Sequence, residues 1–121
     1  MWKELILFVP GSKARKAILG FLEERGAKSV DFGGYQLGQP EDPLEVRIDE
    51  DLWSSYSADE RRIIEEKVPG SEPVLFLYFK EATLIALLGE FATGRDWFVD
   101  EGKAGYLTLR TVRDLLAERD S

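Results

Sequence analysis

The chain has 121 residues, of which 44% are hydrophobic and 32% are charged, and it carries a formal net charge of −7. These values are typical of one globular domain spanning residues 1–121, large enough to bury a core without disulfides. The sequence contains no cysteine and no histidine. It therefore excludes disulfide scaffolds, Cys/His zinc sites, thiol nucleophiles and histidine general bases.

The N-terminal part of the sequence predicts a strand, a helix and a second strand. Residues 5–9 are all apolar and are followed by a Pro-Gly pair, which is typical of a strand covered on both faces. A helix with one apolar stripe is expected from Ser12, its N-cap, to Gly26, its C-cap. Alternation around Val30 predicts a short second strand, and we interpret residues 33–43 as a loop.

The central part predicts two strands separated by a helix. Residues 44–48 alternate between apolar and polar, which indicates a strand with one face on the core and one in water. Ser57 and Glu60 have the spacing of a capping box and open a short helix. Residues 74–79 are apolar and rich in aromatic side chains, which predicts a buried strand.

The C-terminal part predicts a helix, a hairpin and a final helix. The apolar residues of the helix expected at 81–92 extend beyond one stripe, so this helix is either deeply buried or part of an interface. Residues 96–100 and 104–107 flank a Glu-Gly-Lys turn and predict a hairpin. The final helix is expected to begin at Thr108.

The element order is β-α-β-β-α-β followed by α-β-β-α. It predicts the α+β class, as a two-layer sandwich with a ferredoxin-like split β-α-β-β-α-β core and a C-terminal α-β-β-α extension. The alternative is a three-layer α/β arrangement, because two of the strands look buried on both faces.

The apolar runs and the net charge of the sequence predict its cellular location and the classes of partner that it lacks. No apolar run approaches the roughly 20 residues that span a bilayer, and residues 5–9 are too few for the apolar region of a signal peptide. We therefore expect a cytoplasmic protein with no membrane partner. The negative net charge also argues against a nucleic-acid partner, because phosphate binding needs a cationic footprint.

The negative charge is concentrated in residues 41–60, here called the acidic segment. This segment holds eight acidic residues and one basic residue, Arg47, so it accounts for the whole net charge of −7. Carboxylates beside the rings of Trp53 and Tyr56 suit the binding of arginine and lysine. The residues expected to contact a basic partner protein are Asp49, Glu50, Asp51, Trp53, Tyr56, Glu41, Asp42 and Glu45.

This composition predicts a small protein-interaction domain. One form would be an inhibitor or immunity-type protein that blocks a cationic partner such as a nuclease toxin. The alternative is a solvated loop in which Trp53 folds inward onto the core. The spacing of the carboxylates lacks the glycine and the closing glutamate of an EF-hand loop, so no metal site is predicted.

A second hypothesis is a regulatory domain that binds a small anion. Gly11, Ser12 and Lys13 lie where a buried strand passes into a helix. Backbone N–H groups, a hydroxyl and cations at such a position can hold phosphate or carboxylate. The sequence is not a Walker A loop, which needs two glycines at a fixed distance before the lysine.

A third hypothesis is an enzyme that uses carboxylates, and we lean against it. The chain contains no GxSxG elbow, no SxxK pair and no nucleotide-binding glycine pattern, so no catalytic residue and no cofactor are predicted. A homodimer is a further expectation. It would form through Leu84, Leu88 and Phe91, or through the hairpin that carries Trp97.

Overall fold

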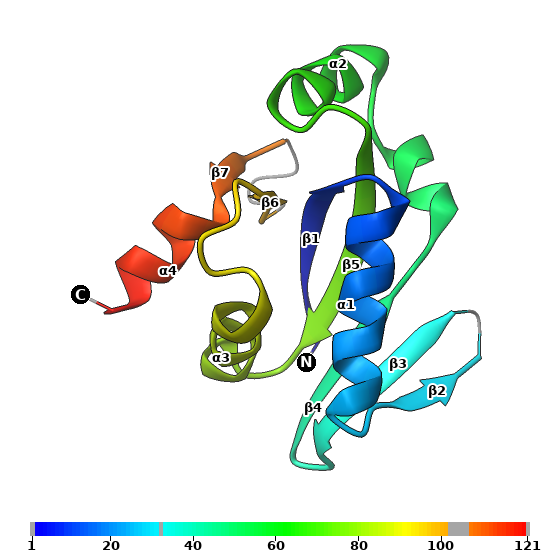
Figure 1. Cartoon of the computed structure of the whole chain (residues 1–121), viewed down its shortest axis with the longest axis vertical. Coiled ribbons are helices and arrows are strands. Elements are labelled where there is room, and N and C mark those ends of the chain that lie inside the picture. The colour runs from blue at the N-terminus through cyan, green and yellow to red at the C-terminus, as the bar shows by residue number, and fades with distance from the viewer. Residues whose placement is uncertain (1, 32, 102–106, 121) are drawn as a thin grey trace.

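The computed structural model describes residues 2–31, 33–101 and 107–120. It contains a seven-stranded antiparallel sheet with the strand order β2-β3-β4-β5-β1-β6-β7 (Figure 1). The strands are β1 (Lys3–Pro10), β2 (Lys28–Val30), β3 (Gly34–Gln39), β4 (Asp42–Arg47), β5 (Ser71–Tyr78), β6 (Phe98–Asp100) and β7 (Leu109–Thr111). The helices are α1 (Ser12–Glu24), the 3-10 helix η1 (Glu50–Ser55), α2 (Ala58–Lys67), α3 (Glu81–Phe91) and α4 (Val112–Asp120).

Strand β1 lies inside the sheet, between β5 and β6, and pairs with β5 along its whole length. Successive side chains of a strand point to opposite faces of the sheet. Leu7 and Phe8 are both completely buried, and they belong to two different hydrophobic clusters. The prediction of a strand covered on both faces at residues 5–9 is therefore confirmed.

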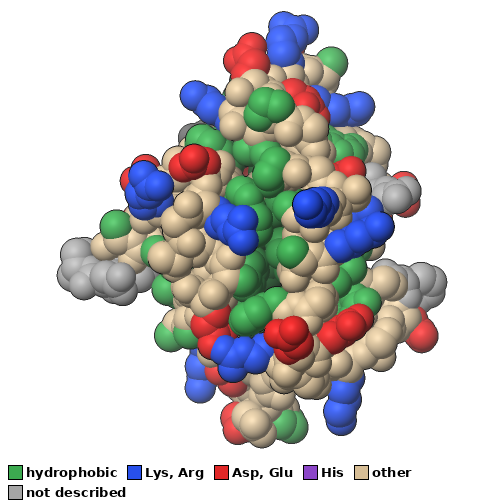
Figure 2. All heavy atoms as spheres, viewed as in Figure 1, with side chains coloured by type: hydrophobic (Ala, Val, Ile, Leu, Met, Phe, Trp, Pro, Cys, Tyr) green, Lys and Arg blue, Asp and Glu red, His purple; other side chains and the backbone are tan. Residues whose placement is uncertain are grey.

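Three helices cover one face of the sheet and form the larger core. Leu22 of α1, Leu88 of α3 and Leu115 of α4 are buried in one cluster with Leu7 and Phe76 of the central strands. Apolar side chains remain visible along the seam between α1 and α3 (Figure 2). Across the described residues, every helix is too short or too polar to span a bilayer.

The opposite face is covered in part by η1 and α2. Ile64 of α2 and Val68, the C-cap of that helix, pack with Tyr56 over the completely buried ring of Phe8, and Trp53 of η1 packs against this group. We call these five residues the second core. Figure 1 places α2 and the tip of the β3–β4 hairpin at opposite ends of the molecule.

The α+β class is confirmed, but the strand order does not support a ferredoxin-like core. A split β-α-β unit leaves one strand between its first two strands in chain order, whereas β5, β4 and β3 all separate β1 from β2. Helices lie on both faces, as in the three-layer alternative. The antiparallel pairing throughout the sheet nevertheless keeps the fold in the α+β class.

The interpretation of residues 33–43 as a loop is wrong, because β3 pairs with β4 there in a hairpin. Near the turn, Gly38 has a φ of +85°, and a Cβ added to it would lie 2.5 Å from the carbonyl oxygen of Asp42. Such a close approach of two backbones requires glycine. The glycines and prolines that build this hairpin are the residues that obscure a strand in a sequence pattern.

The helix starts agree with the sequence in one case and differ in another. The capping box of α2 is confirmed: Ser57 Oγ accepts from the Glu60 N–H at 3.2 Å, and Glu60 Oε1 accepts from the Ser57 N–H at 2.9 Å. The N-cap of α1 is Gly11 rather than Ser12, and no side chain caps this helix.

The C-terminal elements are shifted relative to the prediction. The partner of β6 is β7 rather than a strand at residues 104–107. Of the predicted hairpin, residues 102–106 lie outside the described residues. Helix α4 begins at Val112 rather than at Thr108, because Leu109 and its neighbours are paired in the sheet.

Two helix interiors carry a glycine where alanine fits. Gly20 in α1 and Gly89 in α3 are exposed, and a Cβ added at either position meets nothing within 4 Å. We expect Gly20→Ala and Gly89→Ala each to raise the free energy of unfolding by about 0.5–1 kcal/mol, because glycine loses more backbone entropy in a helix. Guanidinium denaturation measures this change. A loss of stability in either variant would contradict the open surroundings of that glycine.

Candidate functional site

The structure divides the acidic segment between two ends of a strand. Glu41 lies in the turn before β4, whereas Asp49 and Asp51 follow β4 at its other end. The six residues of β4 span about 20 Å at roughly 3.3 Å per residue. The predicted partner-binding residues therefore do not form one continuous patch.

Glu45 lies between these two ends and is engaged within the chain. It is only 7% exposed. Its carboxylate accepts hydrogen bonds from Arg47 Nε at 2.7 Å and from Gln36 Nε2 at 3.2 Å. The sheet turns this side chain toward Arg47, the basic residue of the same segment, and the contact of Glu45 with a partner stays a prediction.

Asp42 also has an internal partner. Its Oδ2 accepts a hydrogen bond from the Thr83 hydroxyl, which links the start of β4 to the first turn of α3. Glu41, one residue earlier, is exposed. At this end of β4, Glu41 is thus the more accessible of the two carboxylates.

The two aromatic rings of the segment point into the protein. Tyr56 is 7% exposed and donates a hydrogen bond from its hydroxyl to Asp100 Oδ2 at 2.8 Å. Burial, reinforced by this hydrogen bond, raises the pKa of the Tyr56 phenol far above its ordinary value. The ring and the hydroxyl of Tyr56 are thus both used inside the fold, and its role as an anchor for a partner stays a prediction.

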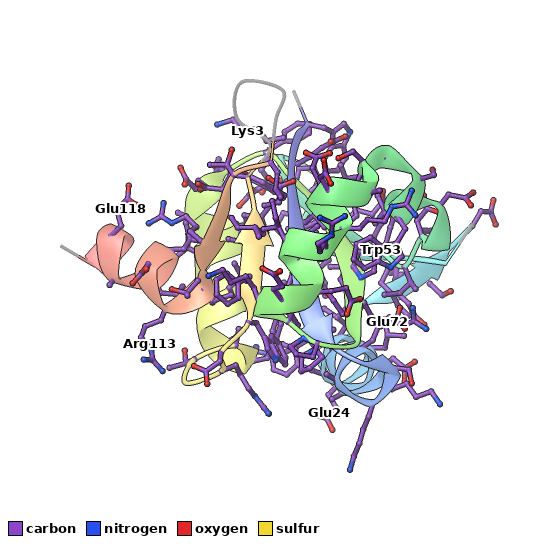
Figure 3. All side chains as sticks on the ribbon, turned by 90° about the horizontal axis from the view of Figure 1, so that it is seen from above. Lys3, Glu24, Trp53, Glu72, Arg113 and Glu118 are labelled. Atoms are coloured by element: carbon purple, nitrogen blue, oxygen red, sulfur yellow. The ribbon has the colours of Figure 1, made fainter. Side chains whose placement is uncertain are left out.

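Trp53 is partly buried and belongs to the second core. Its ring lies 5.8 Å from the ring of Phe8 and 6.2 Å from that of Tyr56. Seen from above, it lies beside α2 (Figure 3). The inward orientation that the sequence left open for Trp53 is the observed one, and it fixes η1 onto the sheet.

The carboxylates of η1 remain at the surface. Asp49 and Asp51 are both exposed, and Glu50 lies between them in the chain. Asp49 Oδ1 accepts a hydrogen bond from the Asp51 N–H at 2.9 Å, so Asp49 is the N-cap of η1. Among the described residues, neither Asp49 nor Asp51 takes part in an ion pair.

The predicted anion site at Gly11, Ser12 and Lys13 lies at the start of α1. Gly11 has a φ of +94° and precedes the first turn of α1, where Ser12 and Lys13 are exposed. Arg15 extends instead toward β5 and forms an ion pair with Glu72 at 3.1 Å. Arg15, two residues after Lys13, is thus neutralised within the chain.

The predicted homodimer residues belong to the chain's own core. Leu84 and Leu88 are buried, and Phe91 lies between the rings of Phe21 and Trp97 at 5.4 and 6.3 Å. Trp97 is buried as well. Helix α3 packs against both the sheet and α4 and uses its broad apolar surface there, so the deeply buried alternative describes this helix, and the homodimer stays a prediction.

A hollow of about 540 Å³ follows the β3–β4 hairpin, and the sequence did not indicate it. We call it the hairpin pocket. Its lining residues are Trp2, Arg25, Gly26, Lys28, Gln36, Leu37, Gly38, Gln39, Pro40 and Pro43. No sequence motif joins these residues, because they meet only once β3 pairs with its neighbours.

Comparison with known proteins gives no relative of this chain: no family model, no curated protein and no solved structure matches it.

Proposed function

We propose that this protein is a small interaction domain that binds a basic partner protein at the η1 end of the molecule. The observation that carries the proposal is the exposure of Asp49 and Asp51 on a turn whose backbone is held by the Asp49 cap and by the packing of Trp53 and Tyr56 in the second core. The contact surface consists of these two carboxylates, with Glu50 between them in the chain, and the neighbouring face of α2.

Helix α2 offers an apolar contact beside further charge. Ile63 is 44% exposed, one of two large hydrophobic side chains at the surface of the described residues. Asp59 is exposed one helical turn earlier on the same face, where it pairs with Arg62 at 3.4 Å. An apolar side chain near carboxylates suits a partner that presents aliphatic stems ending in cations.

Rigidity of the acidic turn supports binding. Trp53 and Tyr56 hold η1 to the sheet, so the carboxylates keep their spacing before a partner arrives. Pre-organisation of this kind reduces the entropy lost on association. Excess negative charge at the same place raises the encounter rate with a cationic surface by about 10- to 1,000-fold at low salt.

The physiological form that we propose is an inhibitor or immunity-type protein. Its carboxylates would occupy a cationic site where the partner otherwise binds phosphate groups. We also propose a cytoplasmic location. Cell fractionation tests the location.

A photo-crosslinking residue in place of the exposed Ser55, at the end of η1, tests the interaction directly. We expect it to capture basic proteins from the source cells. The double change Asp49→Asn and Asp51→Asn should lower the yield roughly tenfold, because asparagine keeps the cap but removes the charge. Raising the salt concentration should lower the yield of the unmodified protein in the same way.

The matched control changes the same amount of charge elsewhere. Glu23→Gln and Glu24→Gln alter two exposed carboxylates of α1 and should leave the yield unchanged. Equal losses of crosslinking yield in both double variants would show that binding depends on the net charge of the protein and not on the carboxylates of η1. This result would contradict the proposed site. A yield that responds to neither variant nor to salt would remove the proposal.

A further inference from the structure

The hairpin pocket has a composition opposite to that of the whole chain. The protein carries a net charge of −7, yet the ten residues lining this pocket include two cations, Arg25 and Lys28, and no carboxylate. Its volume of about 540 Å³ lies within the range of small-molecule sites, about 300–1,000 Å³. The charge of the lining favours an anion as the occupant.

The pocket is built where turns bring backbone segments together. Gly26 ends α1 with a φ of +81°, and its N–H donates to the Glu23 carbonyl oxygen at 3.0 Å. Gly38 brings β3 against β4 at a distance that leaves no room for a side chain. The two glycines leave the pocket open because neither has a side chain to fill it.

Flat apolar side chains form another part of the lining. Trp2 is 44% exposed, although its ring is held edge-to-face by Phe79 at a centroid distance of 4.7 Å. Pro40 and Pro43 line the same pocket. An exposed but oriented tryptophan beside two prolines suits the stacking of a planar ring.

The cations differ in how they are engaged. Lys28 is exposed, and among the described residues no ion pair includes it. Arg25 pairs with Glu90 of α3, and its guanidinium lies 5.3 Å from the centre of the Phe21 ring. Lys28 is therefore available as the principal anion contact, and Arg25, whose charge is balanced by Glu90, adds guanidinium N–H donors whose position is fixed by its neighbours.

A smaller hollow of about 230 Å³ adjoins the hairpin pocket. It shares Arg25, Leu37 and Gly38 with that pocket, and its other lining residues are Leu44, Thr83, Ala86, Leu87 and Glu90, the ion-pair partner of Arg25. The charge of Arg25 is thus balanced on the side of the smaller hollow, whereas the lining of the hairpin pocket contains no carboxylate. The anionic group of a ligand is therefore expected in the hairpin pocket and not in the smaller hollow.

We propose that the hairpin pocket binds a planar aromatic anion, with its ring against Trp2 and the two prolines and its carboxylate or phosphate at Lys28 and Arg25. This site is separate from the acidic turn of η1, since the hairpin and α2 lie at opposite ends of the molecule (Figure 1). The inference does not depend on the proposed function.

The test uses two aromatic anions, adenosine 5′-monophosphate and 2-naphthoate. Adenosine is the control for the aromatic part of the ligand alone, and inorganic phosphate is the control for the anionic group alone. Binding is followed by the NMR signal of the Trp2 indole N–H, assigned with Trp2→Phe. We expect at least one aromatic anion to shift this signal with a Kd below about 1 mM, a modest affinity for a ligand of this size. Adenosine and phosphate alone should bind at least tenfold more weakly, and the better of the two anions identifies the anionic group preferred.

Three variants, followed by isothermal titration calorimetry, locate the site. Lys28→Ala and Trp2→Ala should each weaken binding of that anion about tenfold or more, whereas Lys13→Ala, which removes an exposed cation outside the pocket, should leave it unchanged. Loss of binding in Lys13→Ala alone would overturn the inference and assign the anion to the start of α1. The absence of a Trp2 shift with both anions at 5 mM would also overturn it.

Discussion

Replacing Phe8 by alanine is expected to lower the free energy of unfolding by about 3–5 kcal/mol. Phe8 is completely buried, and its ring lies 5.7 Å from that of Tyr56 and 5.8 Å from that of Trp53. Removing it leaves a cavity under η1 that the antiparallel pairing of β1 on both sides prevents from collapsing. The loss is a large part of the 5–15 kcal/mol typical of a domain.

Guanidinium denaturation measures this loss, and the dependence of the free energy of unfolding on guanidinium concentration should have the same slope in both proteins. Ile63→Ala is the matched control: it truncates an apolar side chain of the same region, but one that is 44% exposed, and should change stability by less than about 0.5 kcal/mol. Phe8→Ala should also speed amide hydrogen exchange in η1, because the second core holds that turn in place. A loss below about 1 kcal/mol would contradict the packing described for the second core.

Phe8 also illustrates what the sequence could predict. A short apolar run of five residues that ends at a Pro-Gly pair is typical of a strand inside a sheet covered on both faces, so residues 5–9 indicated their own environment. The capping box at Ser57 and Glu60 is similarly local, since both of its hydrogen bonds join residues three apart. These two features were predicted correctly because neighbours in the chain decide them.

The environment of Tyr56 could not be predicted, because its deciding partner lies far away in the chain. Its hydroxyl bonds to Asp100, which is 44 residues further on. An acidic segment containing aromatic residues is compatible both with a binding surface and with an inward-folded loop as long as the position of Asp100 is unknown. Charge and composition pointed to carboxylates that are exposed, Asp49 and Asp51, but could not orient the rings of Trp53 and Tyr56.

The hairpin pocket was missed for a related reason. Trp2, Arg25 and Lys28 line it together with residues 36–40, which the sequence suggested were part of a loop. The pocket exists because these residues pair with β4 instead. Because β3 was predicted to be a loop, the pocket that it lines could not be predicted either.

Tyr56→Phe is expected to lower the free energy of unfolding by about 1–3 kcal/mol at neutral pH, because the buried Asp100 carboxylate loses the hydrogen bond that the Tyr56 hydroxyl donates to it. The loss should depend on pH in a defined direction. Burial and the Asp100 contact raise the pKa of Tyr56 in the folded protein, while in the unfolded chain the phenol ionises near about 10. Above that pH the folded protein retains a proton that the unfolded chain has lost.

The stabilisation from Tyr56 is therefore complete below about pH 10 and falls by about 1.4 kcal/mol for each further pH unit. The difference in stability between the natural protein and Tyr56→Phe should be constant from pH 7 to pH 9 and should shrink at pH 10.5 and 11.5, as measured by urea denaturation. Ionisation of the remaining side chains contributes to both proteins and cancels in this difference. A difference that stays constant to pH 11.5 would mean that the Tyr56 phenol ionises as easily in the folded protein as in the unfolded chain, which its burial against Asp100 forbids.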